Sequence, residues 1–134
     1  MSDDANPDIG PHEDRELELM LAGQKPLAMF TEVLPVESGL IPEVNFAPHV
    51  ASGRLVMREV FEPAAKLSGD QRKLSLRRVL YALPSDEWRI DAMILVCQVS
   101  ASLRKWDEGL ERVTGKLLGY EDRQIDAFIK KISH

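Results

Sequence analysis

The side chains in this sequence that are best suited to nucleophilic catalysis or metal binding are one cysteine and three histidines. Cys97 lies within an apolar run, where a cysteine usually packs as a small hydrophobic residue and does not act as a nucleophile. His12, His49 and His134 are far apart, and none has a second histidine or cysteine at a spacing that binds zinc. We therefore expect no metal site, no cofactor and no catalytic cysteine.

Paired carboxylates are the next candidates. Two pairs could act in general acid–base catalysis, namely Glu59 with Glu62 and Glu87 with Asp91. Neither spacing is diagnostic of such catalysis. The solvated stripe of a helix is the simpler interpretation of Glu87 and Asp91. The eight glycines are scattered singly, so the chain has neither a glycine-rich phosphate loop nor a Gly-x-Ser-x-Gly elbow. We favour a non-enzymatic protein over an enzyme.

A basic segment over residues 66–78 is a candidate anion-binding site. Its members are Lys66, Arg72, Lys73, Arg77 and Arg78. The rest of the chain is nearly neutral apart from its acidic start, and Tyr81 is the one aromatic residue close to the segment. These two facts favour an ordinary charged loop and strand edge, and a nucleic-acid partner is not expected.

Length and composition indicate one domain with a packed core. The chain has 134 residues, of which 44% are hydrophobic and 29% are charged, as in ordinary globular proteins. The lone cysteine excludes an internal disulfide, and we see no signal peptide and no apolar run long enough to cross a bilayer. We expect a cytoplasmic protein with a mobile acidic leader over residues 1–11 and a single domain over residues 12–134.

Capping residues and apolar periodicity predict four helices. The first covers residues 12–22, and the second is long, running from Ser85 as N-cap to Leu103. The third is capped by Asp107 and ends at Gly119, and the fourth covers residues 121–132. The long helix is apolar almost all round, with one polar stripe of Glu87, Asp91, Gln98 and Ser102, so we expect other elements to cover most of its circumference.

Strands are predicted over residues 26–31, 54–61 and 74–83, the second stopping before Pro63. Residues 74–83 fit both a helical and an alternating pattern, and we choose a strand because the preceding strand needs an antiparallel neighbour. The region 37–53 should be mostly loop, with one helical turn near residues 46–50. The expected fold is therefore α+β, with a small, mainly antiparallel sheet of about three strands packed on the long core helix.

Two features are the candidates for binding a protein partner, although an effect on solubility is the simpler interpretation of the first and core or boundary packing is the simpler interpretation of the second. Residues 1–18 hold seven acids against the single base Arg15, a net charge of −6, whereas the whole chain has a net charge of −5. Trp88 and Trp106 are near the two ends of the long helix, and interfaces are enriched in tryptophan. The candidate partner-binding residues are Glu13, Asp14, Glu16, Glu18, Trp88 and Trp106.

The sequence thus favours a non-enzymatic protein-binding module, such as an adaptor or a small inhibitor of the immunity-protein type. Its partner is unidentified, and would be basic if the acids of residues 1–18 bind it. The alternative is an enzyme or a small-ligand-binding protein whose site is assembled from distant residues, with Arg58, Glu59 and Arg78 as candidates. A third alternative is nucleic-acid binding through the basic segment 66–78.

Overall fold

The structure is a computed structural model that describes residues 15–35, 39–63, 74–103 and 105–132. Along the chain, these residues form α1 (Glu16–Leu21), β1 (Leu27–Leu34), α2 (Glu43–Ala51), β2 (Val56–Pro63), β3 (Ser75–Ala82), α3 (Trp88–Ser102), α4 (Glu108–Leu118) and α5 (Asp122–Ile132). The α+β class predicted from the sequence is confirmed. The leader predicted over residues 1–11 lies outside the described residues, as does the first turn of the helix predicted from residue 12.

The three strands form one antiparallel sheet in the order β1-β3-β2. The choice of a strand for residues 74–83 is confirmed, and this strand is the central one. Both faces of this strand are covered, because Val79 and Leu80 face opposite sides of the sheet and both are fully buried. This is the environment of a central strand. The prediction that β2 stops before Pro63 is wrong. Pro63 is the last residue of β2, and an edge strand tolerates a proline because its outer N–H groups pair with no neighbouring strand.

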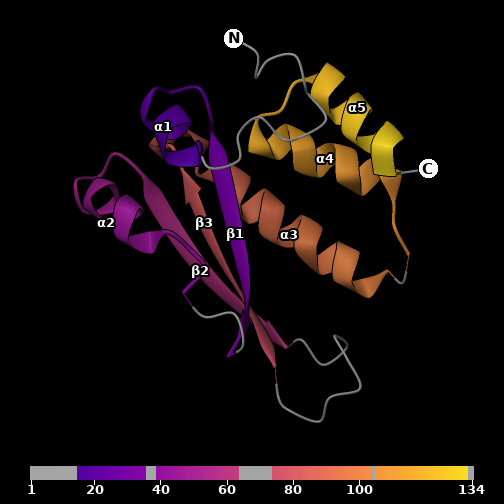
Figure 1. The fold of residues 1–134 in the computed structure, drawn as a ribbon, viewed down its shortest axis with the longest axis horizontal. Coiled ribbons are helices and arrows are strands. Elements are labelled where there is room, and N and C mark those ends of the chain that lie inside the picture. Colours follow the sequence, from indigo (N-terminus) through magenta and orange to yellow (C-terminus); the bar gives the residue numbers. More distant parts are fainter. Residues whose placement is uncertain (1–14, 36–38, 64–73, 104, 133–134) are drawn as a thin grey trace.

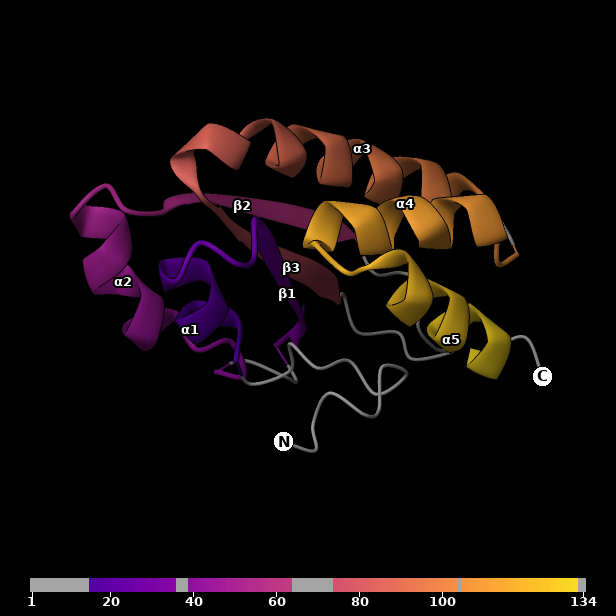
Figure 2. The same ribbon diagram turned by 90° about the horizontal axis from the view of Figure 1, so that it is seen from above.

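Helices cover both faces of the sheet (Figure 1). On one face, α1 and α2 pack over a buried cluster that includes Met20, Phe46, Val79 and Tyr81. On the other face, α3 and α4 pack over a second cluster, in which Ile90 and Met93 of α3 join Leu27 and Leu80 of the sheet and Leu117 of α4. In Figure 2 the two helical layers are on opposite sides of the strands, and α5 packs against α4.

The prediction that residues 37–53 are mostly loop is wrong for the part of this region that the structure describes. Residues 43–51 form α2, although Pro48 lies inside the helix. Phe46 supplies the reason, because it is buried and its ring stacks on Tyr81 with 4.1 Å between the ring centroids. This aromatic contact offsets the backbone hydrogen bond that the proline removes.

The start of the long helix also differs from the prediction. Ser85 lies within the short 3-10 helix η3 (Pro84–Asp86), and α3 begins at Trp88, three residues after Ser85, with Glu87 in the N-cap position. Pro84 suits the first position of a helical turn, so it places this turn where the sequence predicted an N-cap. The other two end signals are confirmed. Asp107 accepts a hydrogen bond from the Leu110 amide at 2.9 Å, and Gly119 ends α4 with φ of +93°.

Among the described helices, none combines the length and the apolar character that crossing a membrane requires.

Candidate functional site

The most concentrated group of charges in the described chain surrounds Arg77. Glu43 accepts hydrogen bonds from both Nη1 and Nη2 of Arg77 at 2.7 Å. Glu59 accepts one from Nε at 2.5 Å, and Glu32 accepts one from Nη1 at 2.9 Å. These four side chains, which we name the Arg77 cluster, come from α2 and from all three strands. Carboxylates from three different elements therefore accept hydrogen bonds from the N–H groups of one guanidinium group.

The sheet register builds the Arg77 cluster. Glu32 on β1 is directly opposite Arg77 on β3, and Glu59 on β2 is opposite Val79, one diagonal step away on the same face. Hydrogen bonds from Arg77 lower the pKa of Glu43, and burial opposes that shift. The same bonds, those to Glu43 first, raise the pKa of Arg77. The guanidinium group therefore stays charged at every pH at which the protein folds.

The Arg77 cluster carries three negative charges against one positive charge. Glu32 is only 3% exposed, and its Oε1 atom is buried with no hydrogen-bond partner. No three or more histidine, cysteine, aspartate or glutamate residues in the described ranges are arranged to hold a metal ion. The geometry is thus that of a structural cross-link that leaves a negative potential on the α1/α2 face of the sheet.

The two described members of the predicted anion site do not lie together. Arg77 and Arg78 are consecutive in β3 and therefore point to opposite faces of the sheet. Arg78 pairs with Glu62 at 3.2 Å on the α3 face, and its Nη1 is 3.5 Å from the hydroxyl of Thr31. The guanidinium groups of Arg77 and Arg78 are thus both already paired with carboxylates. Lys66, Arg72 and Lys73 lie outside the described residues, so anion binding through them stays a prediction.

The structure also keeps apart the residues considered for an enzyme. Arg58 faces α3, where it pairs with Asp91 at 2.8 Å and with Glu87 at 4.0 Å. Glu59, the next residue, faces the opposite side of the sheet and binds Arg77. Arg78 shares the α3 face with Arg58 but is engaged by Glu62. The three candidates are therefore divided between the two faces of the sheet, and each is paired with an oppositely charged side chain.

Cys97 is not activated as a nucleophile. Burial raises the pKa of its thiol, and this is the largest influence on it. Its sulfur is 3.9 Å from the sulfur of Met29 in the second apolar cluster. The thiol therefore stays protonated at neutral pH and packs as an apolar group.

Two of the predicted partner-binding acids, Glu16 and Glu18, line a pocket between α1, β1 and α2. We name it the acidic pocket. Its volume is about 500 Å³, and its other lining residues are Leu17, Phe30, Leu40, Pro42, Asn45 and Phe46. Glu13 and Asp14 lie outside the described residues. Sequence analysis missed the α2 side of this pocket because it predicted that region as loop.

The acidic pocket is lined by both apolar and charged side chains. Phe30 and Phe46 meet edge to face, with 5.5 Å between their ring centroids. Leu40 at the mouth is largely exposed. A Lys or Arg side chain has the matching build, because its aliphatic stem can pack on apolar walls while its charged end meets the carboxylates of Glu16 and Glu18. The acidic pocket is therefore suited to a cation on an apolar stem.

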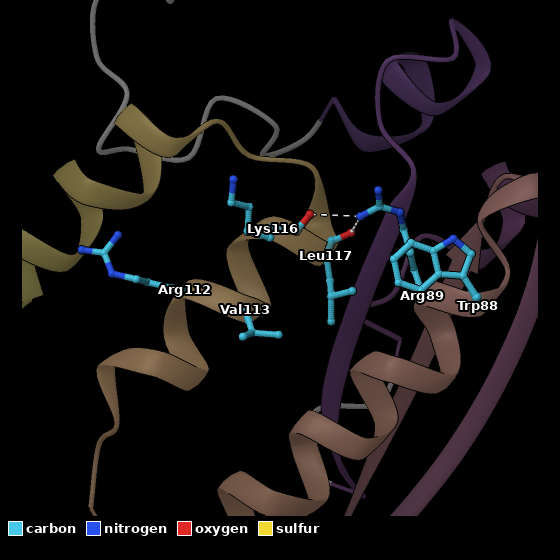
Figure 3. Close-up of a pocket in the computed structure, with 6 residues that line it drawn as sticks. All are labelled: Trp88, Arg89, Arg112, Val113, Lys116 and Leu117. Atoms are coloured by element: carbon cyan, nitrogen blue, oxygen red, sulfur yellow. Dashed lines mark hydrogen bonds between the residues drawn. The ribbon is translucent and has the colours of Figure 1, made fainter.

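The two predicted tryptophan anchors are both exposed. Trp88 lines a groove of about 370 Å³ between α3 and α4, together with Val113 and Leu117 (Figure 3). The guanidinium group of Arg89 is 4.8 Å from the centre of the Trp88 ring and donates hydrogen bonds to the carbonyl oxygens of Lys116 and Leu117. The groove therefore has a fixed polar side and an apolar floor.

Trp106 lies beyond the other end of α3. Its Nε1 donates a hydrogen bond to Glu111 at 3.3 Å, and about half of its surface is exposed. The structure thus places Trp88 and Trp106 at opposite ends of one helix, as the sequence predicted, and it does not bring them into a single pocket.

The prediction that most of the circumference of α3 is covered is wrong. Trp88, Leu95 and Val99 on its outer side are 57%, 59% and 39% exposed. The sheet and α4 cover the side that carries Ile90 and Met93, and nothing in the described chain covers the opposite side. The helix therefore carries apolar residues on both its inner and its outer side but is buried on the inner side only.

Comparisons with protein family models, with curated proteins and with solved structures find no match to this chain.

Proposed function

We propose that this chain is a non-enzymatic protein-binding module whose acidic pocket takes a basic side chain, flanked by apolar residues, from a partner protein. The observation that carries the proposal is that Glu16 and Glu18 line one pocket together with Phe30 and Phe46. The partner side chain is a lysine or an arginine, because both combine an aliphatic stem with a positive end.

The surroundings of the acidic pocket support a basic partner. The Arg77 cluster on the same face of the sheet adds three carboxylates, those of Glu32, Glu43 and Glu59, against the single positive charge of Arg77. Negative potential that is spread over one face attracts a basic segment and speeds its encounter with the protein. A neutral apolar partner would gain nothing from this charge.

Exposed apolar residues beside the acidic pocket support a protein partner over a small cation. Leu40 at the mouth and Val44 on the outer turn of α2 are 66% and 85% exposed. A peptide can cover these side chains with apolar residues next to its lysine or arginine, whereas a small amine would leave them in water. Apolar burial of this kind is a major part of the affinity of protein interfaces.

The proposal is tested with a labelled synthetic peptide in which lysine alternates with leucine, and with a control peptide in which glutamate replaces lysine. We expect fluorescence anisotropy to show binding of the lysine peptide alone, with an affinity that falls as salt is added. The double variant Glu16→Gln/Glu18→Gln should bind about tenfold more weakly, which corresponds to about 0.7 kcal/mol for each of the two carboxylates.

A matched control variant removes two exposed carboxylates elsewhere. Glu108→Gln/Glu121→Gln changes the net charge equally but leaves the acidic pocket intact, so it should bind as the original chain does. Asn45→Trp fills the pocket without changing any charge and should abolish binding. The proposal is wrong if the two double variants bind the peptide equally well. Binding of a free polyamine that the lysine peptide does not displace would also overturn it, in favour of a small-ligand site.

A further inference from the structure

The outer edge of β2 is the open edge of the sheet. Among the described strands, β2 pairs only with β3, whereas α4 packs against β1 at the opposite edge. Figure 1 shows α4 and α5 on the β1 side of the sheet. An edge strand presents N–H and C=O groups that can pair with a strand of another chain. The edge of β2 is therefore the place where this sheet can be extended.

The charges on β2 restrict which strand can pair with it. Arg58 and Glu62 both lie on the face of the sheet that α3 covers, four residues apart, and their side chains are 39% and 21% exposed. Charged side chains usually protect an edge strand from pairing, because most partners place an apolar or like-charged residue beside them. A strand with the opposite charges at the facing positions would instead form ion pairs with them.

A second copy of β2 is such a strand when the two copies are antiparallel. A two-fold axis perpendicular to the sheet keeps the corresponding faces on the same side, so the axis passes beside a residue that faces its own copy. An axis at Arg58 brings two arginines together, and an axis at Glu59 brings two glutamates together. An axis at Val60 places Arg58 of each copy directly opposite Glu62 of the other. Of the axes at residues 58 to 61, the one at Val60 alone gives pairs of opposite charge.

We propose that two copies of this chain pair through β2 in this register and form one continuous sheet of six strands, three from each copy. The paired stretch runs from residue 57 to residue 63, because Met57 of one copy lies opposite Pro63 of the other. Pro63 has no N–H group to donate, but it lies at the ends of the paired stretch. Its loss of one hydrogen bond at each end therefore leaves the centre of the ladder intact.

The two ion pairs between the copies are compatible with the contacts inside each chain. Directly opposite residues on antiparallel strands have Cβ atoms about 5 Å apart, which an arginine and a glutamate can bridge. Arg58 donates a hydrogen bond to Asp91 from Nη1, and a guanidinium group has five N–H donors in all. Glu62 accepts a hydrogen bond from Arg78 with Oε1, so its second oxygen can accept one from the other copy. The new pairs therefore add to the existing contacts and need not break them.

The opposite face of β2 gains apolar contact in the same register. Met57 and Phe61 lie on this face and are 43% and 58% exposed. Phe61 lies opposite Glu59 of the other copy, and Met57 and Phe61 of that copy occupy the two diagonal positions, within reach of an aromatic ring. The carboxylate of Glu59 is bound to Arg77 of its own chain, so its aliphatic stem is the part that meets the ring. Apolar surface that a single copy leaves in water is thus covered in the dimer.

This inference does not depend on the proposed function. The residues that line the acidic pocket lie between positions 16 and 46, outside β2, so the dimer forms without using either pocket. One pair of strands buries a small area for a protein interface, and interfaces of this size form dimers that dissociate on dilution. The dimer should therefore depend on the protein concentration.

Sedimentation analysis of the full chain over a range of concentrations tests the dimer. We expect a monomer–dimer equilibrium that Arg58→Glu weakens about thirtyfold, because both ion pairs become pairs of like charge. The milder change Arg58→Gln should weaken it about fivefold, so the test does not depend on the folding of Arg58→Glu. A chain that stays monomeric up to about 0.5 mM would overturn the proposal.

Arg112→Glu is the matched control for the reversed charge. Like Arg58, Arg112 is partly exposed and pairs with two acidic residues, Glu108 and Asp126, but it lies on α4. Its reversal should leave the monomer–dimer equilibrium unchanged. Equal weakening of the dimer by Arg112→Glu and Arg58→Glu would overturn the proposal, because the effect would then come from net charge and not from the edge of β2.

Charge complementation tests the register. Arg58→Glu alone and Glu62→Arg alone each place like charges opposite one another, so both chains should dimerise less than the original chain. In a mixture of the two, residue 58 of each chain again faces the opposite charge at residue 62 of the other, and a heterodimer should form. A mixture that associates no more than its separate chains would overturn the proposed register.

Cysteine cross-linking tests the same register without reversing a charge, in a Cys97→Ser background. A mixture of Arg58→Cys and Glu62→Cys chains should form a disulfide-linked heterodimer under mild oxidation, because the two cysteines are directly opposite each other. This heterodimer also keeps one of the two ion pairs, between the remaining Glu62 and the remaining Arg58. Neither chain alone should form a linked homodimer. Efficient homodimers of Arg58→Cys would place the axis at residue 58 and overturn the proposal.

Discussion

Glu43 of α2 holds Arg77 of β3 with both carboxylate oxygens, each 2.7 Å from a different guanidinium nitrogen. The contact ties a helix that the sequence did not predict to the central strand of the sheet. Because Glu32 and Glu59 hold the same guanidinium group from the two outer strands, the Arg77 cluster links α2 to all three strands of the sheet.

The first prediction concerns Arg77→Met. This change leaves the buried carboxyl group of Glu32 without its cation, and we expect the free energy of unfolding to fall by about 3 kcal/mol, as when one partner of a buried ion pair is removed. The second change Glu32→Gln should restore part of that loss, because it removes the buried charge. Urea unfolding of the two single variants and the double variant measures this coupling.

Arg123→Met is the control for loss of an arginine. Arg123 is exposed and pairs only with a neighbouring glutamate, Glu121, in the contacts that the structure gives, so its loss should cost less than about 0.5 kcal/mol. If Arg77→Met is as stable as Arg123→Met, or if Glu32→Gln adds to the loss, the Arg77 cluster is not the cross-link described above.

The second prediction is a pH dependence from Glu43. Its pKa is lowered in the folded protein, chiefly by the hydrogen bonds from Arg77, so the unfolded state binds protons more readily than the folded state. The stability contributed by Glu43 is therefore present above its ordinary pKa of 4.5 and is lost as the pH falls through its lowered value in the folded protein. The difference in stability between the original chain and Glu43→Gln should shrink on acidification below that pH.

Glu108→Gln separates this effect from a general loss of negative charge. Glu108 is an exposed carboxylate at the start of α4, far from the Arg77 cluster in the sequence. Unfolding measured by urea at a series of acidic pH values should give a pH-dependent difference for Glu43→Gln that exceeds the one for Glu108→Gln. A Glu43→Gln difference that grows as the pH falls would contradict the prediction.

The strands were only partly predictable from local signals. Residues 74–83, which contain β3, fit both a helical and an alternating pattern, and the choice of a strand rested on the need of the preceding strand for an antiparallel neighbour. The α2 helix was not predictable in the same way. Its stability comes from the stacking of Phe46 on Tyr81, a tertiary contact, whereas its local sequence contains Pro48.

The Arg77 cluster could not be predicted because it depends on strand order. Glu32 and Arg77 are 45 residues apart and meet only because β3 lies between β1 and β2. A weak signal was present in the sequence, since both are charged residues inside strands that are mainly apolar. The acids of the pocket, Glu16 and Glu18, were found from charge alone, but its aromatic walls required the fold.

The third prediction compares two glycines with positive φ. Gly119 has φ of +93°, and a Cβ atom there would lie 2.6 Å from Cδ of Pro26. Gly53 has φ of +83° with open space around it. Gly53→Ala should cost about 1 kcal/mol from backbone strain alone. Gly119→Ala adds a collision with the ring of Pro26 and should cost at least twice as much, as measured by urea unfolding, and equal losses would contradict this reasoning.

The fourth prediction is a rise in stability at alkaline pH that is caused by Lys25. This side chain is buried, and its Nζ donates a hydrogen bond to the Leu118 carbonyl oxygen at 2.8 Å. Burial lowers the pKa of Lys25 from 10.5 to about 8, and the charge of Glu16 opposes the shift. Between these two pH values the folded protein holds fewer protons than the unfolded chain, so stability rises with pH, by at most about 3 kcal/mol.

Lys25→Met should remove this rise, and Lys116→Met, which removes an exposed lysine, should leave it in place. Urea unfolding from pH 7 to pH 10 measures both slopes. Burial raises the pKa of Cys97 and of Tyr81, and both shifts lower stability as pH rises, so the contribution of Lys25 is taken as the difference between the original chain and Lys25→Met. That difference should move in favour of the original chain as the pH passes 8. A difference that stays constant would mean that Lys25 remains charged in the folded protein and that burial does not lower its pKa.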